Sequence, residues 1–237
     1  MDPIVVGIGV ILTCVIAYMI IGSYLTGAVG KEQDMSKAIS SISADSLSKP
    51  DAQRYMYGLW LYVNAWPTAG ALPATTVVPA RTPIFTRNKD MELFLDGTTG
   101  KLVLNVLSDV STTTVANKVQ AITITNNFPI QKWVHIVISV DNQIVDLYLD
   151  GKLVKSVNIS PATHVPDALS AITFTPLSSG SSAFMTKFSR LPTIADPQSV
   201  WNLYMQSSGT GTNGNGKLGV NLSLLKDNIE TGKYAIW

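Results

Sequence analysis

Apolar and polar residues alternate through most of residues 133–154, which read WVHIVISVDNQIVDLYLDGKLV. Because successive side chains of a β-strand point to opposite faces, a period of two predicts strands rather than helices. The alternation stops at Asp141-Asn142 and again at Asp150-Gly151, which are residue types that favour tight turns. This stretch therefore predicts antiparallel strands joined by short turns, and it limits the chain to folds built on a sheet.

The two faces of these predicted strands differ in polarity. Where two apolar faces meet across a tight turn, they predict the core of a β-sandwich. The core side is expected to carry Val134, Ile136, Ile138, Val140, Val145, Leu147 and Leu149, and the other side His135, Val137, Ser139, Asp146 and Tyr148.

Further alternating segments lie on both sides of this stretch, separated by turn-forming Gly, Pro, Asn and Asp. Strands at this spacing are typical of an antiparallel sandwich. The predicted strands are residues 55–63 and 82–87, a hairpin within 91–107 that turns at Asp96-Gly97, residues 121–125 and 182–191, and a strand that starts at Ala171.

One short helix is predicted near the end of this series. Asp196 is a suitable N-cap, and Pro197 suits the first helical position. Val200, Leu203 and Tyr204 then share one face of the helix. The Gly/Asn-rich residues 207–217 follow as a loop that lacks the spacing of a phosphate-binding loop. Residues 218–237 supply two more candidate strands, with a turn near Asp227-Asn228.

The N-terminal segment has a different character, because residues 4–29 contain no Asp, Glu, Lys, Arg or His. A helix needs about 20 apolar residues to cross a bilayer, so this run predicts a single transmembrane anchor within residues 1–30. A cleaved signal peptide is disfavoured, since no Lys or Arg precedes the run and the run exceeds a typical signal core. The residues expected to face lipid include Ile4, Val5, Ile11, Leu12, Val15, Ile16, Ile20 and Ile21.

Residues 31–54 are polar and rich in Ser, and Pro50 lies near their end. They predict either a tether between the anchor and the sandwich or a chain draped over another surface, with a short helix around residues 35–42. The domain organisation expected from the sequence is thus an anchor over 1–30, a tether over 31–54 and a sandwich over 55–237.

Charge and cysteine usage exclude several functions. The net charge is +1, so there is no basic excess to neutralise phosphates and nucleic acid is not expected as a partner. Only 14% of residues are charged, which suits a surface packed against neighbours or membrane. Cys14, inside the predicted anchor, is the only cysteine, and with two His in the chain this argues against a zinc site.

The motifs of the sandwich resemble those of laminin-G-like, or concanavalin A-like, jelly-roll domains. The resemblance rests on FPIQKWVHIVISVDNQIVDLYLDGKLVKSVNI, on the upstream YGLWLYVNAW and IFTRNKDMELFLDGTTGKLVLNV, and on the downstream FMTKFSRLPTIADPQSVWNLYMQ. It covers residues 55–206 in the family's order. It implies a jelly-roll sandwich with Trp133 and Trp201 in the core and a packing or hydrogen-bonding role for His135. The fold hosts lectins, hydrolases, adhesion modules and structural proteins, so it does not by itself give a function.

No recognisable catalytic set accompanies this fold, and the chain is predicted not to be an enzyme. Glycosidases of this fold use paired carboxylates, and the nearest pair here is Glu92 and Asp96. Asp96 belongs to a predicted turn and a third acid is missing. His164 lies in a Pro-bounded loop without a nucleophile motif.

No cofactor is predicted, and two kinds of ligand remain as alternatives. Several relatives of this fold bind calcium through loop oxygens. An exposed aromatic ring can stack on a sugar, and Trp66, in the NAWPTAG loop, is the expected glycan contact. The candidate calcium ligands are Asp109, Asn117, Asp141, Asn142, Asp146 and Asp150, of which Asp141 and Asp150 are also simple turn-formers.

An anchor, a tether and a cysteine-free, charge-poor jelly roll together resemble minor capsid proteins of large icosahedral double-stranded DNA viruses, which lie at an internal virion membrane. The C-terminal GKLGVNLSLLKDNIETGKYAIW is also similar to tails of such proteins. The expected function is that of a single-pass membrane structural protein of the virion, which binds the bilayer through residues 4–29 and contacts other capsid proteins. A membrane-displayed glycan-binding module is the alternative.

Overall fold

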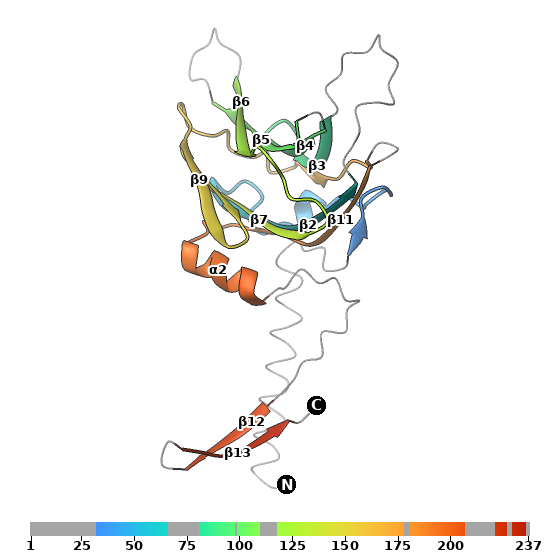
Figure 1. Ribbon diagram of the computed structural model, residues 1–237. Coiled ribbons are helices and arrows are strands. Elements are labelled where there is room, and N and C mark those ends of the chain that lie inside the picture. Colours follow the sequence, from blue (N-terminus) through green and yellow to red (C-terminus); the bar gives the residue numbers. More distant parts are fainter. Residues whose placement is uncertain are drawn as a thin grey trace.

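The computed structural model describes residues 32–65, 81–97, 99–109, 118–177, 181–206, 221–226 and 229–235. Within these residues two antiparallel sheets pack face to face as a sandwich (Figure 1). One sheet has the order β1 (Gln33–Asp34), β11 (Ser182–Leu191), β2 (Arg54–Ala65), β7 (Trp133–Asp141), β8 (Ile144–Leu149), β9 (Lys152–Asn158). The other has the order β10 (Ile172–Thr173), β3 (Arg81–Arg87), β4 (Met91–Asp96), β5 (Lys101–Ser108), β6 (Lys118–Thr125).

The strands lie where the alternating pattern predicts them, and the core forms between the two sheets. The predicted core side of β7 and β8 is buried, with Ile136, Ile138 and Val140 fully enclosed. These side chains pack in one cluster with residues of the facing sheet such as Leu93 and Leu104. The prediction of an all-β sandwich with one short helix is confirmed.

The outer face of the six-stranded sheet is also partly covered, by α2 (Pro197–Gln206) (Figure 1). The helix begins as predicted, because Asp196 Oδ1 accepts hydrogen bonds from the backbone N–H groups of Gln198 and Ser199, each at 3.0 Å. Val200 is fully buried and packs with Val137 on β7 and other residues of this face. The sandwich therefore has a second, smaller apolar cluster outside its main core.

Residues 32–54 pack against the sandwich rather than forming a free tether. β1 pairs with β11, and the adjacent Met35 is buried at 1% exposure. Ile42 forms a bridge with Ile172. The helix expected around residues 35–42 is absent from the described structure, which has a short 3-10 turn, η1 (Ala44–Ser46), instead. The segment looks polar in sequence because its few buried side chains are isolated among serines.

The C-terminal strands β12 (Asn221–Lys226) and β13 (Ile229–Ala235) pair with each other on either side of residues 227–228. In the described structure they form a two-stranded sheet of their own and join neither sheet of the sandwich. The sequence predicts residues 218–237 as part of the jelly roll, whereas the described strands within them pair only with each other.

Several predicted features lie outside the described residues. They are the anchor over 1–30 with its lipid-facing residues, the loop over 207–217, Asn117 and Trp66. Among the helices of the described part, none has the length and apolar character that crossing a membrane requires.

Candidate functional site

A groove of 460 Å³ opens at one end of the six-stranded sheet. Three segments enclose it: the connection from β6 to β7, the turn between β8 and β9, and the helix α2. Each contributes a polar or aromatic side chain, including Asn127 and Lys132 from the connection, Asp150 from the turn, and Trp201 and Tyr204 from the helix.

Asp150 is held firmly in the wall of this groove. Its Oδ1 accepts a hydrogen bond from the His135 backbone N–H at 3.0 Å, and its Oδ2 accepts one from Lys132 Nζ at 2.9 Å. The bond to Asp150 raises the pKa of Lys132, so the ammonium group stays charged at neutral pH. The groove therefore presents a fixed carboxylate and ammonium side by side.

The same turn allows the helix to approach the sheet closely. Gly151 has a φ of 77°, a conformation that L side chains rarely adopt. A Cβ at this position would lie 2.9 Å from Trp201 Cε3 and 3.2 Å from Tyr204 Cβ. Only glycine therefore fits both the turn and the contact. The Asp150-Gly151 pair thus sets the position of both aromatic rings over the sheet.

A stack of rings joins the helix to the sheet beneath it. Tyr204 lies nearly parallel to Trp60, with 5.6 Å between ring centroids, and Trp60 in turn lies 5.0 Å from His135. Burial lowers the pKa of His135 to about 4, with the nearby Lys187 adding to the effect and Asp150 opposing it. His135 is therefore neutral at physiological pH, and it packs beneath the helix as the sequence resemblance implied.

Trp201 differs from the expectation that it belongs to the core. It is 40% exposed, because α2 buries Val200 against the sheet and turns the next residue towards the rim of the groove. Its ring lies 5.6 Å from that of Tyr204. Trp133 is partly exposed as well. The groove thus offers an accessible indole face next to an amide and an ion pair, a combination suited to holding a polar ring-shaped ligand.

A family model described as the concanavalin A-like lectin/glucanases superfamily matches residues 40–189, more than half of the chain. The chain belongs to this superfamily. The match begins inside the segment that the sequence suggested as a tether and ends before α2. The helix that forms one wall of the groove is therefore outside the matched part of this concanavalin A-like domain. A comparison with curated proteins finds no match.

Solved structures with a similar fold include clostridial neurotoxin binding domains. The chain is 12% identical to the structure titled HCR/D F1240A mutant, with a TM-score of 0.53 over 74% of this chain and 42% of that chain. The botulinum neurotoxin serotype G binding domain is 18% identical, with a TM-score of 0.48 over 67% and 38% of the two chains. The binding domain of Paraclostridial Mosquitocidal Protein 1 is 14% identical, with a TM-score of 0.49 over 69% and 38%. The chain spans about two fifths of these solved chains, and the likeness concerns the fold alone.

The carboxylates considered for glycoside cleavage are both engaged in local contacts. Glu92 forms an ion pair with Arg81 and accepts a hydrogen bond from Asn105. Asp96 closes the β4–β5 turn, where its Oδ2 accepts a bond from Thr99 Oγ1 at 2.6 Å. Neither residue lines the groove. Their places in this concanavalin A-like domain are those of a surface ion pair and a turn.

The candidate calcium ligands do not come together. Asp141 and Asn142 lie at one end of β8 and Asp150 at the other, and Asp141 pairs with Arg54 at 2.8 Å. The six residues of β8 put these two ends roughly 20 Å apart. Asp146 faces outward from the middle of the strand. In the described part of the chain, no group of three or more His, Cys, Asp or Glu is arranged to hold a metal ion.

Asp109, the remaining described candidate, lies near His164 instead. His164 Nδ1 is 3.0 Å from Asp90 Oδ1, and its Nε2 is 3.8 Å from Asp109 Oδ1. The His164 backbone N–H also donates to the carbonyl of Leu107 at 2.8 Å. His164 thus connects its loop to the end of β5 in the five-stranded sheet, which is a structural role.

Proposed function

We propose that this chain is a membrane-anchored structural protein whose concanavalin A-like sandwich makes protein–protein contacts. Its proposed place is the virion, as a minor capsid protein that connects a shell to the membrane beneath it. The observation that carries the proposal is the uncharged run over residues 4–29, which ends only a few residues before a sandwich strand. A bilayer is the solvent in which such a run is stable as a helix.

The edge of the sandwich at β9 supports the second half of the proposal. β9 is the last strand of its sheet, and Leu153 and Val154 on it are 50% and 45% exposed. An exposed edge strand with apolar side chains favours pairing with another chain. This edge fits a protein that is packed among neighbours.

The anchor is tested with the full-length chain made in the presence of liposomes and then washed at alkaline pH. Wild type is expected to stay with the lipid, because a spanning helix is retained when surface-bound protein is released. The double variant Leu12→Arg and Ile16→Arg is expected in the supernatant, since each charge at the centre of a span costs about 3 kcal/mol. Leu169→Arg, at a site that is 83% exposed, is the matched control and should behave as wild type. Release of wild type would contradict the proposal.

A glycan-binding module is the second candidate, favoured by the exposed Trp201 beside Lys132 and Asp150 in the groove. Its test is a glycan array probed with the full chain in nanodiscs and with the variant Trp201→Ala. Binding to one class of sugar that falls at least about fivefold in the variant would favour this candidate, since an aromatic stacking contact is worth about 1 kcal/mol or more. Trp201 is a suitable site for the substitution because its ring is at the rim of the groove.

A further inference from the structure

One end of the outer face of the six-stranded sheet carries a row of aromatic side chains. Phe184 on β11 is the register partner of Tyr62 on β2, and Tyr62 is the partner of Trp133 on β7. The ring centroid of Tyr62 lies 6.4 Å from the ring centroid of Phe184 and 5.5 Å from that of Trp133. All three side chains are partly exposed. We call these three residues the aromatic row.

The aromatic row lies on the side of the sandwich that α2 occupies. The residues that precede and follow the row on each strand, such as Leu61 and Val134, point into the main core. The next outward position on β2 is Trp60, which stacks against Tyr204 of the helix. The helix thus covers the middle of this face and leaves the row at its end open.

The row also lies beside the point at which the chain enters the sandwich. Asp34, in the edge strand β1, is the register partner of Phe184. Only four residues separate Val29, at the end of the uncharged run, from Asp34. The five steps from one Cα to the next reach at most about 17 Å when the chain is extended, and neighbouring strands are about 5 Å apart. The predicted end of the span is therefore close to the row.

The physical character of the row fits the boundary between lipid and water. Tyr and Trp combine an apolar ring with a polar tip, and they concentrate at membrane interfaces. The surface at this end is also nearly balanced in charge. Lys37 pairs with Asp34 at 3.5 Å and Lys132 pairs with Asp150 at 2.9 Å, while Lys187 and Glu32 add one charge of each sign. A surface with nearly equal numbers of positive and negative charges suits contact with phospholipids whose headgroups carry no net charge.

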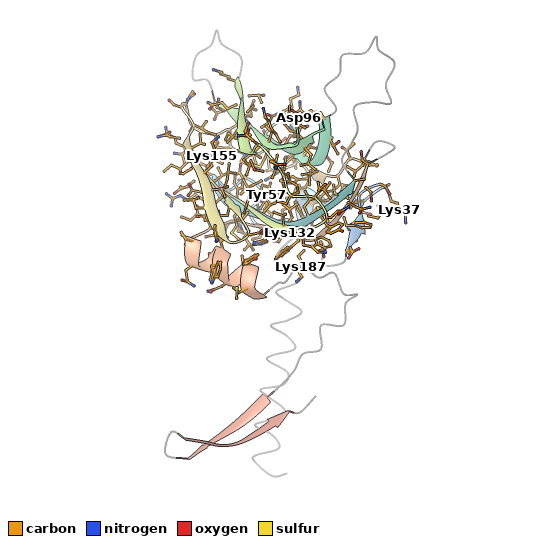
Figure 2. All side chains as sticks on the ribbon, viewed as in Figure 1. Lys37, Tyr57, Asp96, Lys132, Lys155 and Lys187 are labelled. Atoms are coloured by element: carbon orange, nitrogen blue, oxygen red, sulfur yellow. The ribbon has the colours of Figure 1, made fainter. Side chains whose placement is uncertain are left out.

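The outer face of the other sheet has a different composition. The register row Thr86, Glu92 and Asn105 crosses β3, β4 and β5 and is polar throughout. Apolar residues on this face lie among polar ones: Val119 on β6 is exposed beside its register partner Leu107, and Arg81 Cζ lies 4.2 Å over the ring of Phe94. Figure 2 shows Lys187 on the side of the sandwich that carries α2, and Asp96 on the opposite side. The two faces of the molecule therefore differ in what they can contact.

We propose that the aromatic row rests in the headgroup layer of the bilayer that holds the anchor, so that the sandwich lies on the membrane with the outer face of its six-stranded sheet turned towards lipid. This inference rests on the proposed anchor. The occupant it assigns to the row is a neutral phospholipid surface. A second copy of the chain, or another protein, would be a different occupant and is separated from lipid by the experiment below.

The test places a fluorescent label on each face of the full-length chain in phosphatidylcholine nanodiscs. Cys14→Ser removes the native thiol, and Lys187→Cys or Val119→Cys then provides one exposed labelling site. Discs of brominated phosphatidylcholine quench a label that lies at the lipid surface. The label at position 187 is expected to lose about half of its emission or more, because Lys187 lies on the same side of the sandwich, three residues after Phe184 on β11, and would lie within the interfacial layer of about 5–10 Å. The label at position 119 is expected to keep its emission.

A further variant tests whether the aromatic row itself, and not only the nearness of the anchor, brings the label to the lipid surface. Phe184→Ser in the chain labelled at position 187 is expected to restore much of the emission, whereas Leu169→Ser, at an exposed site away from the row, should leave the quenching as it was. A chain that fails to enter the discs would overturn the proposed anchor together with this inference. A chain that enters the discs but shows no quenching at 187, equal quenching at both positions, or quenching unaffected by Phe184→Ser, would overturn this inference and leave the anchor standing.

Discussion

At the scale of single residues, two buried arginines hold residues 48–50 against the sandwich. Arg190 donates from Nη1 to the Ser48 carbonyl at 2.7 Å and from Nη2 to the Lys49 carbonyl at 3.0 Å. Arg87 donates from Nη2 to the Pro50 carbonyl and from Nε to Ser170 Oγ. Both side chains are at most 2% exposed. A segment without regular structure is thus fixed by charged donors that satisfy its carbonyls.

Substituting Arg190→Met is expected to lower the free energy of unfolding by roughly 3 kcal/mol, because it keeps the apolar stem but leaves buried carbonyls without donors. Urea unfolding of the full chain in detergent micelles, followed by far-UV circular dichroism, measures the change. Lys152→Met, at an exposed position, is the matched control and should change the free energy by less than about 0.5 kcal/mol. Equal effects of the two substitutions would show that the carbonyl contacts contribute little.

His135 makes the stability of the sandwich depend on pH. Its pKa is lowered to about 4 in the folded chain, mainly by burial, from an ordinary value of 6.5. Between these values the unfolded chain binds the proton more readily, so stability falls as the pH drops from about 6.5 to 4. From pH 7 to pH 5 this residue alone is expected to remove about 2 kcal/mol.

The substitution His135→Phe tests this, since the ring can still pack between Trp60 and Tyr204. The free energy of unfolding, measured by urea titration, is expected to fall less between pH 7 and pH 5 for the variant than for wild type. The difference between the two chains should be the roughly 2 kcal/mol assigned to His135. Parallel pH profiles for the two chains would rule out His135 as the source.

At the scale of elements, the packing of α2 depends on the turn between β8 and β9. Gly151→Ala is expected to destabilise the chain by about 1 kcal/mol through its positive φ and also to displace the helix, because the new Cβ would meet Trp201. Gly100→Ala carries the same backbone cost at a φ of 72° in the β4–β5 turn and is the matched control. Tryptophan emission should shift only in Gly151→Ala. A shift in both variants, or in neither, would contradict this account of the helix contact.

Elements with a strong repeating pattern could be predicted from the sequence, and those held by a few isolated contacts could not. The strands of both sheets follow from alternation, and the start of α2 follows from its cap at Asp196 and Pro197. Residues 32–54 could not be recognised as part of the domain, because Met35 and Leu47 are single buried side chains in a polar stretch. Such contacts leave no periodic signal.

The groove was missed for a related reason. Helical periodicity places Val200 and Tyr204 on one side of α2, but it does not predict which neighbouring residues of the helix contact the sheet and which face the groove. That choice is made by the backbone at Gly151, which is distant in sequence from the helix. The turn-forming roles expected for Asp96 and Asp150 are seen directly in their hydrogen bonds. Trp66 and Asn117 lie outside the described residues and stay predictions.

At the scale of the whole molecule, the proposed membrane span precedes a sandwich of the concanavalin A-like superfamily. The sandwich is fixed to the entering chain by β1 pairing, by Met35 and by the arginine contacts to residues 48–50. Few residues therefore remain to link the proposed span to the domain. This arrangement is expected to keep the domain at the lipid surface, within reach of neighbours in a shell and with β9 at an open edge.

The most direct test is a cryo-electron microscopy structure of the full-length chain in a phosphatidylcholine nanodisc. The account predicts one helix across the disc and the sandwich in contact with the disc surface, with α2 and the aromatic row on the lipid side. A sandwich separated from the disc by a long linker, or a chain that does not cross the disc at all, would contradict it.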